Sequence, residues 1–135
     1  MIDIKQIYYD MGNAVNGICD KTFSRNRPKA VDTKLNSFIV VGIPYSIRNN
    51  EISDDGRYND YSTTAQIEVY VRNKTSRGNT NCFDLSTMDE KVSRVLRLFP
   101  LSTGNITLTR PSIMIQSDDG NGFDVTIITC RLKTK

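Results

Sequence analysis

The stretch that decides the fold is Ser37-Phe-Ile-Val-Val-Gly-Ile-Pro44, a nearly continuous apolar run rich in β-branched residues. Such a run is typical of a strand that is buried on both faces. A second stretch, Ala65-Gln-Ile-Glu-Val-Tyr-Val-Arg72, alternates apolar and polar residues, as a half-buried strand does. The segment between them, which includes residues 48–60, is polar and turn-prone. We therefore predict a long β-hairpin whose tip projects from the body of the protein.

Amphipathic helices are predicted on both sides of this hairpin. Residues 2–21 carry apolar side chains at spacings of three and four, and an extended polar connection is expected over residues 22–36. The second helix ends at Pro100. Asn81 or Asp84 can cap it, and Thr87-x-x-Glu90 offers a capping box for a later start. The buried stripe expected for this helix is Leu85, Met88, Val92, Val95, Leu96 and Phe99.

The C-terminal third reads as β structure. Strands are expected over residues 106–109, 113–116 and 123–132, with Asp118-Asp-Gly-Asn-Gly122 as the turn before the last one. The phase of the final strand shifts at Ile127-Ile128, which indicates a bulge or a fully buried central strand. The order of elements predicts one α+β domain over residues 1–135. Its sheet is mixed and mostly antiparallel, with two helices packed on one face and a long projecting β-hairpin.

Composition is that of a globular protein, because 38% of residues are apolar and 24% are charged. The longest apolar run is too short for a membrane helix, and the N-terminus does not have the pattern of a secretory signal. Three cysteines at distant positions, Cys19, Cys82 and Cys130, fit no metal or redox spacing and are expected to be reduced and mostly buried. The net charge of +3 is scattered, which neither argues for nor excludes contact with DNA.

Catalytic chemistry finds little support in the sequence. The chain has no histidine, which removes the commonest general base and the commonest metal ligand. The pairs Asp54-Asp55 and Asp118-Asp119 each precede a glycine, where aspartate is favoured for turn geometry alone. No phosphate-binding glycine motif and no calcium-loop register occurs. We therefore predict a non-enzymatic protein without cofactor or metal. An enzyme with a lysine or carboxylate centre is the remaining catalytic alternative.

The two polar stretches, residues 48–60 and 73–81, are the candidate contact surfaces. Long segments without apolar side chains are retained when they bind something, and tyrosine is favoured at interfaces. The simpler alternative is flexible surface loops in a protein whose function lies elsewhere. The residues that we expect at a subunit interface carry both signs of charge and one aromatic ring: Arg48, Glu51, Asp54, Asp55, Arg57, Tyr58, Lys74 and Arg77.

The order of these elements resembles phage tail-completion and tail-terminator proteins. The resemblance is carried by an amphipathic N-terminal helix, by the strand that ends in Pro44, by the strand Ala65–Arg72 and by the helix of the pattern Met88-x3-Val92-x2-Val95-Leu96-x2-Phe99-Pro100. It covers most of the chain and rests on order and spacing, without an invariant motif.

The resemblance implies a non-enzymatic virion protein that forms a closed ring, a hexamer or dodecamer, around the DNA channel between tail and head-side connector. The implied partners are other copies of the chain, neighbouring connector and tail proteins, and DNA that passes through the channel without being read. Assembly would take place in the host cytoplasm. The alternative is a cellular binding module for a small ligand or nucleic acid that uses the 48–60 and 73–81 loops.

Overall fold

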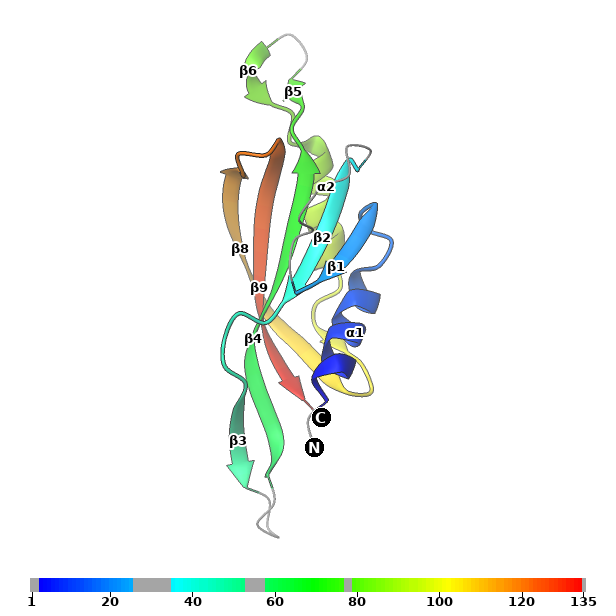
Figure 1. The fold of residues 1–135 in the computed structure, drawn as a ribbon, viewed down its shortest axis with the longest axis vertical. Helices are drawn as coiled ribbons and strands as arrows, with labels where there is room; N and C mark the ends of the chain where they lie inside the picture. The colour runs from blue at the N-terminus through cyan, green and yellow to red at the C-terminus, as the bar shows by residue number, and fades with distance from the viewer. Residues whose placement is uncertain (1–2, 26–34, 53–57, 77–78, 135) are drawn as a thin grey trace.

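The computed structural model describes residues 3–25, 35–52, 58–76 and 79–134. The fold is α+β, with two helices and a mostly antiparallel sheet in the order β1-β2-β4-β9-β8-β7, where β3 also pairs with β4 (Figure 1). A separate two-stranded sheet joins β5 and β6. In chain order the elements are α1 (Ile4–Val15), β1 (Lys21–Ser24), β2 (Ser37–Gly42), β3 (Arg48–Ile52), β4 (Tyr58–Arg72), β5 (Thr75–Ser76), β6 (Asn79–Phe83), α2 (Ser86–Leu96), β7 (Leu101–Ser102), β8 (Ile106–Asp118) and β9 (Phe123–Thr134).

The two stretches that decide the fold lie side by side at the centre of the sheet. β2 pairs antiparallel with β4, from Ser37 opposite Val71 to Gly42 opposite Gln66. On its other side β4 pairs with β9 without a register shift. The first six residues of β9 are all buried. The phase shift at Ile127-Ile128 therefore marks a fully buried central strand, which confirms one of the two interpretations of the sequence.

Both helices pack on one face of the sheet, and the main hydrophobic core lies beneath them. Helix α1 contributes Ile7, Met11 and Val15, and helix α2 contributes Met88 and Val95, all of which are buried. They meet the strand residues that point to the same side, among them Ile39, Val41, Ile67, Val69, Ile128, Cys130 and Leu132. This arrangement confirms the predicted fold class.

The opposite face, which we call the helix-free face, carries a second cluster built on aromatic rings. Phe38 and Tyr70 stack with ring centroids 4.4 Å apart, and Phe123 meets Phe38 edge-on. Above this cluster the guanidinium of Arg72 lies 4.8 Å from the centroid of the Phe123 ring. The Nε and Nη2 atoms of Arg72 also donate hydrogen bonds to the carbonyl oxygen of Leu35 at 3.0 and 2.6 Å.

Several predicted boundaries are wrong. Helix α1 ends at Val15 rather than at residue 21, because Asn16 is extended and Gly17 has a φ of +84°, a conformation that glycine adopts at little cost. Strand β1 then forms parallel to β2, where an extended connection was predicted. Leu85 was predicted to be buried, but it precedes helix α2 and is 56% exposed. The predicted cap Asp84 accepts hydrogen bonds from the backbone and hydroxyl of Ser86.

The polar stretches are more regular than the sequence suggests. Most of residues 48–60 are in strands, because β3 pairs with the start of β4. Residues 73–81 contain β5 and the start of β6. In the C-terminal third, the two strands predicted over residues 106–109 and 113–116 are one strand, β8, whose register with β9 shifts between Thr109 and Ser112. Arg110, within this bulge, has a φ of +53°.

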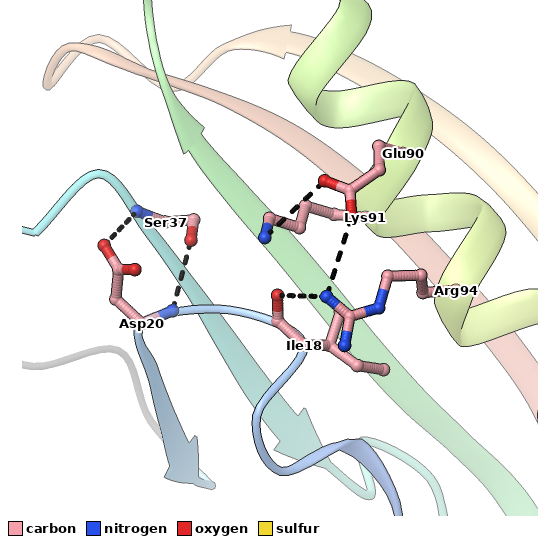
Figure 2. A network of polar contacts seen from close by, with 6 residues as sticks. All are labelled: Ile18, Asp20, Ser37, Glu90, Lys91 and Arg94. Atoms are coloured by element: carbon pink, nitrogen blue, oxygen red, sulfur yellow. Dashed lines mark hydrogen bonds and ion pairs between the residues drawn. The ribbon is translucent and has the colours of Figure 1, made fainter.

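A small polar network holds the N-terminal elements against the sheet (Figure 2). The backbone N–H of Asp20 donates to Ser37 Oγ at 3.2 Å, and the backbone N–H of Ser37 donates to Asp20 Oδ2 at 3.3 Å. From helix α2, Arg94 Nη1 lies 3.5 Å from the carbonyl oxygen of Ile18 and 3.6 Å from Glu90 Oε1. These contacts fix the start of β1 beside β2 and explain why the short edge strand forms there.

Candidate subunit interface

The outer edge of β8 is the most exposed apolar feature of the sheet. β7 pairs with β8 only at Thr107 and Leu108. Beyond this point no strand of the described residues covers the outer edge of β8. An open strand edge presents unpaired backbone N–H and C=O groups, which form a template for another strand. The second half of β8 is therefore available for pairing.

Three consecutive apolar residues lie on this open part of β8. Ile113, Met114 and Ile115 are 49%, 57% and 79% exposed. Ile113 and Ile115 point to the side of the sheet that carries the helices, because Ile113 lies opposite the core residue Ile128. Met114 points to the helix-free face. Proteins usually protect an edge strand with charged residues or proline, and a long apolar edge that remains uncovered leads to aggregation. An apolar edge of this kind is typical of a protein-binding surface.

Two hairpins extend from opposite ends of β4 (Figure 1). Strand β4 has 15 residues, which corresponds to about 50 Å at ~3.3 Å per residue. At one end it forms the predicted projecting hairpin with β3, and at the other end the chain continues into the β5–β6 hairpin. The two extensions therefore differ in sequence and point away from each other (Figure 1).

The predicted interface residues that the structure describes lie at both of these ends, and Arg48 and Lys74 are not brought together. Arg48 is exposed and lies opposite Ser62 at the base of the β3–β4 hairpin. Lys74 is exposed and follows β4 at its other end. Glu51 and Tyr58 lie within the paired strands β3 and β4. Asp54, Asp55, Arg57 and Arg77 lie outside the described residues.

A groove of about 600 Å³ opens where the β3–β4 hairpin leaves the sheet. Strands β3, β8 and β9 each contribute one arginine to it: Arg48, Arg110 and Arg131. The rest of the lining is mostly hydroxyl side chains and Tyr45, with no carboxylate: Tyr45, Ser46, Ser62, Thr63, Thr64, Thr129 and Cys130. Arg110 and Arg131 are not recognisable as site residues in the sequence, because only the register of the sheet brings them near Arg48.

The two cysteines whose side chains are described are buried and free of disulfide bonds. Burial raises the pKa of the Cys130 thiol to about 12 and also raises that of Cys19. A thiol with a raised pKa stays protonated near neutral pH and is a poor nucleophile.

Among the described residues no group of three or more His, Cys, Asp or Glu side chains is placed to hold a metal ion. Asp119, which was predicted to serve turn geometry, accepts hydrogen bonds from the backbone N–H groups of Asn121 and Phe123.

Neither a protein-family model nor a curated protein sequence matches this chain. No helix within the described ranges is both long and apolar enough to span a bilayer.

Proposed function

We propose that this chain is a non-enzymatic structural subunit that assembles with copies of itself into a ring in the neck or tail of a phage. The observation that carries the proposal is the uncovered apolar edge of β8, where Ile113, Met114 and Ile115 are exposed together. A catalytic role gains no support from the described residues, because the two described thiols are buried and the contacts of the aspartates are structural. Asp84 and Asp119 accept hydrogen bonds in a helix start and a turn, and Asp10 and Asp20 join separate elements of the fold.

The partner that we propose for the β8 edge is another copy of the chain. Among the described residues the sheet ends in β1 on one side and in the short strand β7 on the other, beyond which the second half of β8 has no neighbouring strand. Pairing β8 of one copy with β1 of the next is a head-to-tail contact, which closes into a ring when its rotation divides a full turn. A contact of β8 with β8 of a second copy would instead give a two-fold dimer. The proposal therefore commits to the head-to-tail arrangement.

The hairpins at the two ends of β4 support the same proposal. Within a ring, the β3–β4 hairpin is long enough to reach beyond its own subunit to a neighbouring copy or to a ring stacked next to it. The β5–β6 hairpin would make the corresponding contact on the other side. Different contacts at the two ends suit a component that joins unlike partners, as a neck ring joins tail and connector.

The proposal is tested by locating the chain in phage particles. We expect electron cryomicroscopy of particles from cells that carry the gene to show density for this fold as a ring at the head–tail junction. Neighbouring genes for portal and tail-tube proteins are expected on the same grounds. A chain that is absent from purified particles, or present in them as isolated monomers, contradicts the proposal.

A further inference from the structure

The arginine groove concentrates positive charge on the helix-free face. Residues Ile128, Cys130 and Leu132 of β9 pack in the core beneath the helices, so Arg131 points to the other side. In the sheet Arg131 lies between Thr64 of β4 and Thr109 of β8. Arg110 follows Thr109 directly, and Arg48 joins from β3 through its pairing with Ser62.

No carboxylate whose side chain the structure describes forms an ion pair with Arg48, Arg110 or Arg131. All three are exposed and line one groove. Like charges held close together repel one another, and the repulsion is relieved when an anion binds between them. The bulge at Arg110 strengthens this reading, because a non-glycine residue with a φ of +53° is disfavoured. This backbone conformation takes Arg110 out of the regular hydrogen-bond ladder between β8 and β9.

The lining favours phosphate over carboxylate as the anion. Arginine binds phosphate oxygens with a planar fork of donors, and serine and threonine hydroxyls are common additional donors to the nucleic-acid backbone. The groove combines three arginines with hydroxyl side chains and contains no lysine. Two of these hydroxyls already have partners, because Thr63 Oγ1 donates to the carbonyl oxygen of Ser46 and Thr129 Oγ1 is hydrogen-bonded to Ser112 Oγ. Its four strands β3, β4, β9 and β8 span about 14 Å at ~4.8 Å per strand, which is enough for several phosphates of one DNA strand.

We infer that this groove binds the phosphate backbone of duplex DNA through Arg48, Arg110 and Arg131, without reading the base sequence. Phosphate contacts carry no sequence information, and the groove offers no set of amide side chains for base edges. The inference goes beyond the ring proposal and does not depend on it, because the complete groove lies on one subunit. A protein that binds DNA as a monomer would leave this inference standing and reject only the ring.

The test is fluorescence anisotropy with the full chain and a labelled 20-base-pair duplex at increasing salt. Three phosphate contacts predict a slope of about −2.7 for log K against log salt, or about a 40-fold loss of affinity between 50 and 200 mM salt. The triple variant R48Q/R110Q/R131Q is expected to bind at least about tenfold more weakly at 50 mM salt and to lose most of the slope. Each single Arg→Gln substitution is expected to reduce the slope by about 1.

The matched control is Arg97→Gln, which removes an exposed arginine at the end of helix α2, outside the groove. It is expected to leave both affinity and slope unchanged. Circular dichroism checks that each variant is folded, and the single variants keep the test decisive if the triple variant unfolds. The inference is overturned if the groove variants bind like wild type, or if R97Q weakens binding as much as they do. Equal affinity for polyglutamate, or a preference above tenfold between two unrelated duplexes, overturns it as well.

Discussion

Ile113 of β8 lies directly opposite Ile128 of β9 in the antiparallel ladder, yet Ile128 is completely buried whereas Ile113 keeps 49% of its surface exposed. The two residues point to the same side of the sheet and differ only in their distance from its edge. Helix α2 packs on β4 and β9 and leaves the end of β8 uncovered. The change from buried to exposed over one strand is the reason why we propose that a second subunit pairs with β8.

Ile115→Lys should prevent assembly without unfolding the subunit. Ile115 is 79% exposed, so the substitution is expected to change the free energy of unfolding by no more than about 0.5 kcal/mol. A lysine on an open edge opposes pairing with another strand, because the partner would have to bury its charge. The measurements are urea unfolding and light scattering. The control is Ile4→Lys, at a 54% exposed isoleucine on helix α1, which should assemble normally. If I115K also assembles normally, the β8 edge is not the interface.

Shortening the β3–β4 hairpin should likewise separate folding from assembly. Arg48 and Ser62 lie directly opposite each other, so an Asn-Gly turn between them can replace residues 49–61. The shortened chain is expected to fold with equal or slightly higher stability, because a shorter loop loses less entropy on closure. Ring formation, or docking of the ring to the next component, is expected to fail. Normal assembly of this variant would mean that the hairpin is only a solvated connection.

Arg72→Lys should destabilise the isolated subunit. The guanidinium of Arg72 donates two hydrogen bonds to the carbonyl oxygen of Leu35 and lies over the Phe123 ring. Lysine keeps the charge but lacks the planar fork, so we expect a loss of about 1–2 kcal/mol in the free energy of unfolding. Urea unfolding measures this loss, and Arg97→Lys, at an exposed position, serves as the matched control. Equal stability of R72K and wild type would show that the fork contributes nothing.

The buried thiol of Cys130 should make the protein less stable in alkali. Its pKa in the folded protein is raised to about 12 by burial, whereas an unfolded thiol ionises near pH 8.5. The folded state therefore holds its proton where the unfolded state releases it. The contribution of this thiol to the free energy of unfolding is therefore complete below about pH 8.5, and it is lost as the pH rises from there towards 12.

The measurement is the free energy of unfolding of wild type and of Cys130→Ala at pH 7 and pH 10. The variant is expected to be less stable at pH 7, because it leaves a cavity, and to lose less stability between the two pH values. An identical pH dependence in both proteins would exclude Cys130 as the cause.

The sequence predicts the centre of this fold well and its margins poorly. The sequence correctly identifies β2, β4 and β9, because the apolar patterns of these strands reflect their burial in the sheet. For β2 and β4 this pattern can be seen in residues 37–44 and 65–72 alone. Four further strands are polar and form because a neighbouring strand completes their hydrogen bonds: β1, β3, β5 and β6. The pairing of these strands depends on the register of the sheet, and the local pattern of apolar residues does not indicate it.

The candidate surfaces show the same limit. The sequence predicts a strand over residues 113–116, and only its place near the edge of the sheet leaves Ile113, Met114 and Ile115 exposed. Arg48 was identified from its polar surroundings. Arg110 and Arg131 were missed because residues more than 60 positions away from Arg48 meet it only after the sheet has formed.

The most direct test of the central claim is the mass and shape of the wild-type assembly. Purified full-length chain is studied by light scattering and negative-stain electron microscopy from low to high protein concentration. The account predicts a closed ring of one defined mass, a hexamer or dodecamer, which I115K fails to form. A wild-type chain that stays monomeric over the whole range, or that stops at a two-fold dimer, would contradict it.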